Sequence, residues 1–499
     1  MKFNNPNDQY MQYSELPKLL KRYSFPEKAR ICNIYSRKAM NLALKEKVAP
    51  IEFYTIAREW SLETFFMLSV EAIEYSDGDF RGKNEIKLKK MIKAIEDYSL
   101  RPFDKVEKDF QADYYLSTTA LTHLDLQRSM WIKAYRYWSF FTDDSSPIQL
   151  KTIFKNKFGA DYYEFLMLGL CLRSMYIEQT EASQIWVDYL LRERFNDATQ
   201  KLTISRNEYI ELQKMYSGEN GDISNYIYCL RPSYQFPFIE YQKKVYIPLP
   251  HLLMQSVTSS LLYRLTDGNN DLRTQIGKNV VELYLKRIFD EAALYDEVYG
   301  EQPYIYSGSE SKSPDVMARK GKSVLFLDSK STVPSMGIRF FDRNSYETNI
   351  AIVAENIKKL HNQIERFELY NPFGGNVSDT RENWWGIVVI LEDAYIRREH
   401  YYKKAGELLS IKENSLDWEW LTTHIKVLDL YEIERHCFSS SDIVKALEDS
   451  LTRREYGYSL PLFVDDKDMF TNDKLLCFKE NTLNDLGVII SDLNERRLR

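Results

Sequence analysis

Long hydrophobic runs are missing from this sequence of 499 residues. The longest apolar stretch, residues 165–172, ends at Arg173 and is far shorter than the roughly 20 residues that a membrane-spanning helix needs. Residues 1–6 lack the apolar core of a secretory signal. These absences argue against a membrane protein and against export, so we expect the protein in the cytoplasm.

Cysteine and histidine are scarce and scattered. The five cysteines are odd in number and form no disulfide framework. No pair of cysteines has the spacing of zinc ligands, and the six histidines are dispersed along the chain. Any metal in this protein is therefore expected to be bound by oxygen atoms.

An excess of positive charge is also missing. The chain has 67 Lys and Arg against 73 Asp and Glu, a net charge of −6, which is the wrong sign for a protein that coats nucleic acid nonspecifically. Any contact with phosphate must then be local. A glycine-rich phosphate loop of the Walker type is absent as well, which disfavours a phosphohydrolase that acts on small nucleotides.

The length and the periodicity of apolar residues predict more than one domain. Residues 1–200 are expected to form an all-helical recognition, sensor or partner-binding domain, which is also where a protein partner or a second copy of the chain would bind. Residues 201–270 contain a connecting hairpin and helix, residues 271–400 the catalytic core, and residues 401–499 an extension that completes or caps this core.

A β-hairpin is predicted where two short apolar runs, residues 316–318 and 324–327, flank a polar turn. If residues 320–323 form a four-residue loop, Arg319 lies opposite Val324. Counting back along both strands then places Asp315 opposite Asp328. The sequence thus predicts that two carboxylates face each other.

Two like charges in this arrangement destabilise a sheet unless something offsets their repulsion. Mg²⁺ does so naturally, because it prefers oxygen ligands and is commonly held by one or two carboxylates together with water and phosphate. Mn²⁺ can substitute for it. Lys330 follows Asp328 by two residues and is expected on the same face of its strand.

Helices are predicted on both sides of the hairpin in sequence. Residues 277–289 carry an apolar stripe next to Glu282, which can reach the end of the sheet. Residues 346–369 form a second helix whose polar face offers Asn356, Lys359 and Gln363, and the spacing does not select one of them. Residues 384–391 are predicted to be a buried strand of the central sheet.

The set of helix glutamate, Pro-Asp and Asp-x-Lys resembles the PD-(D/E)XK nuclease superfamily, over about residues 275–392. The residues that carry the resemblance are Glu282, Pro314, Asp315, Asp328, Ser329 and Lys330. It implies an α+β fold, in which an all-α N-terminal region precedes a restriction-endonuclease-like mixed β-sheet core flanked by helices. It also implies a Mg²⁺-dependent endonuclease that hydrolyses phosphodiester bonds in nucleic acid, with DNA favoured, in bacterial restriction or anti-phage defence.

The resemblance assigns a role to each residue of this set. Asp315 and Asp328 would hold Mg²⁺, Glu282 would bind or orient a second ion or its water, and Lys330 would stabilise the nucleophile or the transition state. Contacts to nucleic acid are expected first from the hairpin turn, Arg319, Lys320 and Lys322. The sequence also offers the pair Arg339 and Arg343, in the polar segment after Lys330.

One other interpretation remains open from the sequence. Taken singly, a Pro-Asp is most often a turn and an Asp-Ser-Lys at a strand end is most often a solvated strand exit. The chain would then be a catalytically degenerate nuclease fold that binds nucleic acid or protein. The agreement of the helix glutamate, the spacing, the hairpin register and the apolar strand favours the metal site.

Overall fold

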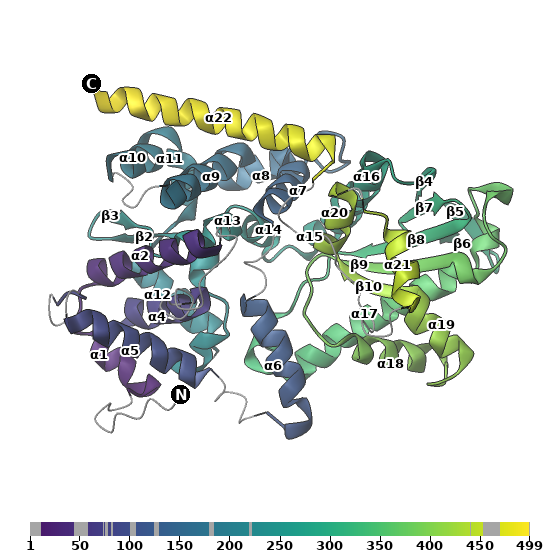
Figure 1. Cartoon of the computed structure of the whole chain (residues 1–499), viewed down its shortest axis with the longest axis horizontal. Helices are drawn as coiled ribbons and strands as arrows, with labels where there is room; N and C mark the ends of the chain where they lie inside the picture. The colour runs from purple at the N-terminus through teal and green to yellow at the C-terminus, as the bar shows by residue number, and fades with distance from the viewer. Residues whose placement is uncertain are drawn as a thin grey trace.

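The computed structural model describes residues 11–43, 58–72, 74, 78–80, 83–99, 106–123, 129–178, 184–218, 222–439, 441–452 and 470–498. Parts of the predicted first and last domains, residues 1–10 and 453–469, lie outside these ranges. The predicted α+β class is confirmed: helices make up most of the N-terminal half, and the main sheet lies in the C-terminal half (Figure 1). No helix in the described part of the chain is both long and apolar enough to cross a membrane.

One helix lies at the centre of the N-terminal region. α4 (Glu59–Glu71) is buried from Trp60 to Val70, including its polar residues. A helix buried on all sides needs partners on all sides, and α4 packs against α1, α2, α5, α6 and α12. These are α1 (Leu16–Leu20), α2 (Phe25–Ala43), α5 (Lys83–Tyr98), α6 (Lys108–His123) and α12 (Arg206–Tyr216).

A second group of helices continues this region toward the sheet. It consists of α7 (Met130–Thr142), α8 (Leu150–Phe158), α9 (Tyr162–Glu178), α10 (Gln184–Tyr189), α11 (Asn196–Leu202), α13 (Leu253–Ser256), α14 (Ser259–Thr266) and α15 (Asn270–Ile276). The C-terminal α22 (Asp473–Leu498) returns along the top of Figure 1 and packs on α7 and α9. The end of the chain is thus attached to its helical half.

The predicted connecting hairpin is present as β2 (Phe238–Tyr241) and β3 (Lys244–Tyr246). Gln242 and Lys243 both have positive φ, +50° and +62°, which is the backbone of a two-residue turn that matches strand twist. β1 (Thr203–Ser205) adds to β2 in parallel and completes a three-stranded sheet. This small sheet lies among the N-terminal helices (Figure 1).

The main sheet has five strands in the order β10-β9-β8-β7-β4. They are β4 (Glu297–Gly300), β7 (Val316–Lys320), β8 (Ser323–Lys330), β9 (Trp384–Ile390) and β10 (Ile425–Asp429). β4, β7 and β8 are antiparallel neighbours, whereas β8, β9 and β10 run parallel. β8 and β9 are buried on both faces, which explains why both read as nearly continuous apolar runs. A separate hairpin, β5 (Pro303–Tyr306) and β6 (Ser309–Lys312), extends between β4 and β7 in the chain.

Helices cover the two faces of this sheet. On one face, Phe326 and Val388 belong to the same buried cluster as Ile357 of α17 (Arg343–Ile364), and α18 (Arg398–Leu409) packs on α17. On the other face, Leu327 belongs to the cluster of Leu285 in α16 (Glu282–Ala292), beside α20 (Leu430–Phe438). Since side chains alternate along a strand, every second residue of β8 after Phe326 points toward α17.

A buried ion pair joins the helical half to the sheet half. Arg136 of α7 donates from Nε to Oε1 of Glu434 in α20 at 2.7 Å, and both side chains are almost fully buried. The same oxygen accepts from the hydroxyl of Tyr284 in α16, also at 2.7 Å. The cluster of α7 therefore continues into that of α16 and α20. The boundaries drawn from the sequence at residues 200, 270 and 400 stay predictions.

Lys426 is a buried charge without an ion pair among the described residues. It lies in β10, only 3% of it is exposed, and its Nζ donates to the carbonyl oxygen of Thr422 at 3.2 Å. Burial lowers the pKa of Lys426 to about 8. In the unfolded chain a lysine has a pKa of about 10.4. Between these pH values the unfolded state binds more protons, so the protein gains stability as the pH rises.

We expect Lys426→Met to stabilise the protein at pH 7, because it removes the cost of burying a charged ammonium group, on the order of 3 kcal/mol. The advantage of the variant over the wild type should shrink as the pH rises from about 8 to about 10. Denaturant unfolding of both proteins across this range measures it. A constant difference between the two proteins at every pH would contradict the assignment.

Candidate functional site

The register predicted for the hairpin of residues 316–327 is confirmed. Arg319 pairs with Val324 and Val316 pairs with Leu327, so the next step along both strands brings Asp315 beside Asp328. The predicted loop length is wrong, because Lys320 also pairs with Ser323 and only Gly321 and Lys322 form the turn. A turn shortened at both ends by one residue leaves the register unchanged. Gly321 has φ +58°, a conformation that favours glycine.

Asp315 is held by the strand opposite to it. Its Oδ2 accepts hydrogen bonds from the backbone N–H of Ser329 at 2.6 Å and from the hydroxyl of Ser329 at 2.9 Å. Burial and, after it, the charge of Asp328 raise the pKa of Asp315 to about 6, although the bonds from Ser329 oppose this shift. The two carboxylates are therefore close enough to repel each other.

Asp328 has no solvent exposure, and two ammonium groups face it. Nζ of Lys359 in α17 lies 2.7 Å from Oδ1, and Nζ of Lys330 lies 3.5 Å from Oδ2. Lys330 thus lies on the same side of β8 as Asp328, as predicted from the alternation of side chains. Oδ2 of Asp328 is buried and accepts no hydrogen bond from any described residue.

The structure selects Lys359 from the three polar residues that the sequence offered on this helix. Asn356 donates to the carbonyl of Ile352, and Gln363 donates to the carbonyl of Lys312. Burial alone would lower the pKa of Lys359, but the charge of Asp328 and the hydrogen bond to it outweigh burial, and the pKa is raised. Spacing placed Lys359 on the correct face, but only the packing of α17 on β8 shows its partner.

Glu282 approaches the site from the opposite face of the sheet. It is the first residue of α16 and follows a π-helical turn, Gly277–Val281, a distortion that is frequent at functional sites. Gly277 lets this π-helical turn lie close to the end of β8, because a Cβ at residue 277 would lie only 2.9 Å from the hydroxyl oxygen of Ser331, just beyond β8.

The charge on Glu282 depends on the same carboxylates. Burial and, after it, the charges of Asp315, Glu301 and Asp328 raise the pKa of Glu282 to about 8, although Lys330 opposes this shift. The predicted carboxylates thus lie within electrostatic range of one another. They are not, however, gathered as one ligand set: no three Asp, Glu, His or Cys residues in the described ranges lie where they could hold a metal ion together.

The two aspartates still suit a divalent cation. Oδ2 of Asp328 is a buried carboxylate oxygen without a hydrogen bond from the described residues, and Oδ1 of Asp315 likewise accepts none from them. Mg²⁺ is commonly bound through only two carboxylates, with water and substrate phosphate as its other ligands. The donor set of Asp315 and Asp328 fits this pattern, with Glu282 further away.

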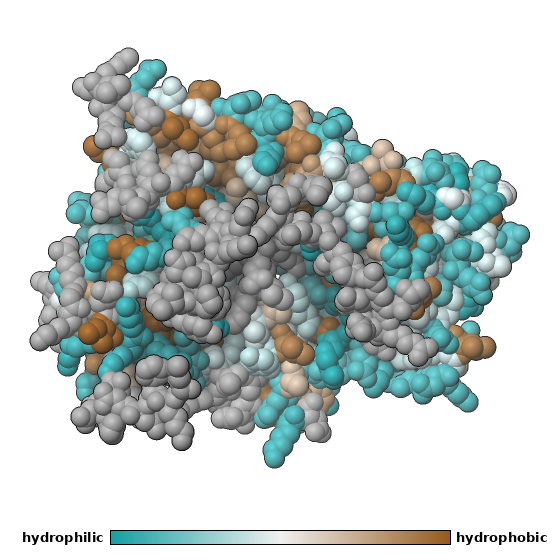
Figure 2. Space-filling model, viewed as in Figure 1, coloured by the Kyte–Doolittle hydropathy of each residue, from teal (hydrophilic) through white to brown (hydrophobic). Residues whose placement is uncertain are grey.

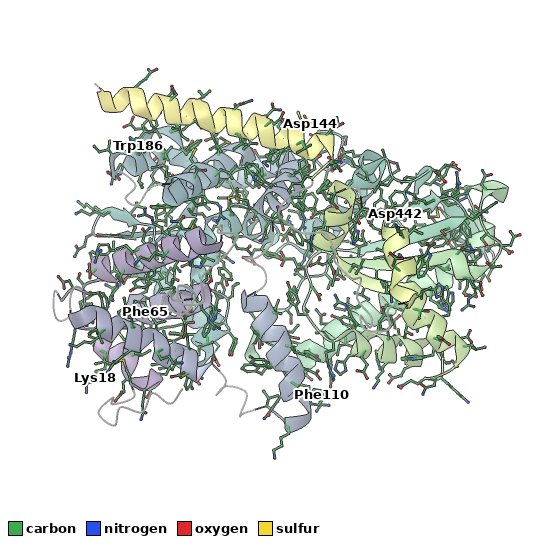
Figure 3. The ribbon with its side chains drawn as sticks, viewed as in Figure 1. Lys18, Phe65, Phe110, Asp144, Trp186 and Asp442 are labelled. Carbon is green, nitrogen blue, oxygen red and sulfur yellow. The ribbon has the colours of Figure 1, made fainter. Side chains whose placement is uncertain are left out.

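The hairpin turn, predicted to contact nucleic acid, lies at the other end of the strands. Asp328 follows Ser323 by five positions along β8, roughly 17 Å of extended chain. Arg319 is paired with Glu297 and Asp296, and Lys320 lies 3.3 Å from Asp442, which Figure 3 labels before α21 (Ile443–Thr452). Lys322 is exposed at the turn.

The two other predicted contacts also differ in their surroundings. Arg343 is bound by Glu347 at 2.7 Å and by Glu107 at 3.2 Å, and it lies over the ring of Phe110. Arg339 has no carboxylate partner among the described residues; it points to the carbonyl oxygens of Tyr228 and Leu121 at 3.4 and 3.5 Å. Arg339 is therefore the better placed of the two to meet a phosphate.

Comparisons with models of protein families, with curated proteins and with solved structures give no match. The functional argument therefore depends on the geometry of the carboxylates and lysines.

We expect Lys359→Met to destabilise the protein, because it removes an ion-pair partner from a fully buried carboxylate. The cost should be about 1–2 kcal/mol, below the roughly 3–5 kcal/mol of a wholly buried pair, since 46% of the Lys359 side chain is exposed. In an Asp328→Asn background the same substitution should cost clearly less, which a double-mutant cycle by denaturant unfolding measures.

Lys358→Met is the matched control for this cycle. Lys358 lies on the same helix, is half-buried and makes only a partly exposed pair with Glu355 at 3.3 Å, which contributes little to stability. An equal cost of Lys359→Met in both backgrounds would show that the pair with Asp328 is not what holds this lysine.

Proposed function

We propose that the protein is a metal-dependent nuclease that hydrolyses phosphodiester bonds in nucleic acid. The observation that carries the proposal is the buried carboxylate of Asp328, with one unbonded oxygen, beside Asp315 and between two lysines at the ends of neighbouring strands. A structural ion pair has no need of a second carboxylate at this place, since each buried like charge adds repulsion.

Asp315 and Asp328 are the residues that would hold the cation. When bound there, a divalent cation supplies a water of lowered pKa and a positive charge for the phosphate. The hydrogen bonds from Ser329 fix one oxygen of Asp315 and so aim the other, because a carboxylate held at one oxygen cannot rotate freely. The β8 backbone thereby orients both aspartates at once.

The lysines would act on the phosphate and on the attacking water. Lys330 is one-third exposed and Lys359 nearly half exposed, so the ammonium groups face both Asp328 and solvent. Positive charges in fixed positions stabilise the charge that develops on a phosphate during displacement. Glu282, at the start of α16, would orient a water or a second ion, as the resemblance to PD-(D/E)XK nucleases implies.

DNA is the favoured substrate and restriction or anti-phage defence the favoured setting, both only by that resemblance. A second candidate function is a nuclease fold that binds nucleic acid or protein without cleaving it. One observation favours it: the Lys359 ammonium already neutralises one oxygen of Asp328 at 2.7 Å. The two functions differ in whether a divalent cation binds and whether cleavage follows.

We expect the full-length protein to cleave at least one of duplex DNA, single-stranded DNA and RNA in the presence of Mg²⁺ or Mn²⁺. Asp328→Asn and Lys330→Met should each lower the cleavage rate by about 10²-fold or more, because they remove a metal ligand and a charge at the phosphate. Lys358→Met changes a half-buried lysine of α17 that is paired with Glu355 and not with Asp328, so this variant should cleave at the wild-type rate. Cleavage by Asp328→Asn as fast as by the wild type would refute the site.

A separate expectation concerns stability in the presence of metal. Mn²⁺ should stabilise the wild type by roughly 2.7 kcal/mol at a hundredfold excess over its dissociation constant, since it binds only the folded state. Asp315→Asn should melt at a higher temperature than the wild type without metal, because it removes one of two repelling charges, and it should lose most of the response to Mn²⁺. Thermal unfolding with and without Mn²⁺ tests both parts. A full response in Asp315→Asn would mean that the metal binds elsewhere.

A further inference from the structure

A large cavity lies between the helical half and the loops that leave the main sheet. Its volume is about 690 Å³, within the range typical of ligand sites. One wall comes from α12, α14, α15 and the segment around Tyr234. The other comes from residues 333–335 after β8 and from residues 392–395 after β9. The cavity therefore joins the two halves of the molecule.

Three arginines line this cavity, and none has a carboxylate partner among the described residues. Arg264 bonds to the carbonyl oxygens of Gln235 and Lys201 and lies over the rings of Phe158 and Phe236. Arg339 points only to carbonyl oxygens. The side chain of Arg273 in α15 makes no ion pair or hydrogen bond to a described residue, and the residue is half-buried.

Several half-buried arginines near the sheet do have a carboxylate partner: Arg287, Arg319 and Arg398 are each paired with an aspartate or glutamate. The three arginines of the cavity differ from these because none of them has such a partner among the described residues. Three acids line the cavity: Asp393 is held by Arg398 at 2.6 Å, Asp267 is exposed, and Glu392 is half-buried. Since a guanidinium binds phosphate through two parallel hydrogen bonds, the arginines of the cavity suit a ligand that carries phosphate.

The remaining lining suits the rest of a nucleotide. Tyr216, Tyr234 and Tyr263 contribute aromatic rings, and Gln235 and Gln255 contribute amides. Bases stack on aromatic side chains, and stacking tolerates any base sequence. The cavity thus combines cations with rings, the combination that binds nucleotides in single strands.

The cavity begins where the candidate catalytic strand ends. Val333 of the cavity wall follows Lys330 by three residues, at most about 10 Å of chain. The loops after β8 and β9 are also bonded to each other, since the N–H of Leu391 donates to the carbonyl of Lys330 at 3.0 Å and that of Glu392 to Thr332 at 3.2 Å. A strand with its phosphate at Asp328 could continue into this cavity.

We infer that the cavity binds a nucleotide unit through its phosphate, with Arg273 and Arg339 as the contacting cations. The inference deepens the proposed nuclease function, on which it rests where the unit belongs to the nucleic-acid strand that is cut. A free nucleotide offers the same phosphate and base. The two sources are separated by using a strand and a mononucleotide as different probes.

The test measures binding by the full chain in EDTA, so that no cleavage occurs. The probes are a fluorescein-labelled oligothymidylate of about twelve nucleotides, followed by anisotropy, and AMP, followed by calorimetry. Arg273→Gln and Arg339→Gln should each weaken oligothymidylate binding about tenfold, since each removes a charge-assisted contact. Each should also reduce the slope of log K against log salt by about 0.7.

Arg192→Gln is the matched control, because Arg192 is exposed in the π-helical turn Leu190–Arg194 and does not line the cavity. It should bind as the wild type does. Thermal unfolding checks that each variant is folded. Because the two cavity arginines lie on different segments, one variant is enough for the test if the other does not fold.

The outcomes separate this inference from the nuclease proposal. If AMP binds through the arginines and the strand does not, the result supports the cavity as a nucleotide site and shows that its ligand is a free nucleotide. If the strand binds through the arginines but the protein cleaves no nucleic acid, the result supports the cavity as a nucleotide site and contradicts the nuclease proposal. Two results would overturn the inference even if the protein cleaves nucleic acid. In one, both cavity variants bind both probes with wild-type affinity. In the other, neither the wild type nor any variant binds either probe.

Discussion

The burial of one charge organises the site and much of the fold around it. Asp328 has no solvent exposure, and a carboxylate is stable in such a place only if cations and hydrogen-bond donors compensate for the lost water. β8 supplies Lys330 and α17 supplies Lys359. The packing of α17 on the sheet is therefore tied to this carboxylate, because a shift of α17 would remove Lys359 from Asp328.

A second buried charge connects this site to the helical half. Glu434 accepts from Arg136 of α7 and from Tyr284 of α16, and Glu282 begins the helix that contains Tyr284. The position of Glu282 relative to the sheet therefore depends on how α7 packs. The helical half is thus positioned to influence the site through α16 as well as through the cavity beside the loops after β8.

The distribution of charge is compatible with the phosphate ligand that we propose for this acidic protein. The net charge of −6 excludes a broad cationic surface, and the face of the sheet half seen in Figure 2 is mainly hydrophilic rather than apolar. The cations that matter are few and are held in fixed places: two lysines at Asp328 and three arginines in the cavity. Fixed cations in partly buried positions attract phosphate more strongly than solvated ones, because the local dielectric constant is lower.

Elements set by local periodicity were predictable from the sequence. The apolar runs of β8 and β9 and the three-and-four spacing of α17 predicted these elements, and the alternation of side chains predicted that Asp315 lies beside Asp328 with Lys330 on the same face. These features depend on neighbours a few residues apart or on one hairpin register. The turn length was wrong by two residues because the pairing of Lys320 with Ser323 is compatible with the same register.

The partners of the long charged side chains were decided by the tertiary structure alone. The sequence left Lys359 equivalent to Asn356 and Gln363, whereas the structure pairs Lys359 with Asp328. The sequence also predicted that Arg319 contacts nucleic acid, and it did not reveal the ion pairs of Arg319 with Glu297 and Asp296. The cavity brings Arg273 and Arg339 together from segments that are distant in the chain. A lysine or arginine reaches several ångströms in many rotamers, so its partner is set by which elements pack nearby, and periodicity along the chain carries no information about that.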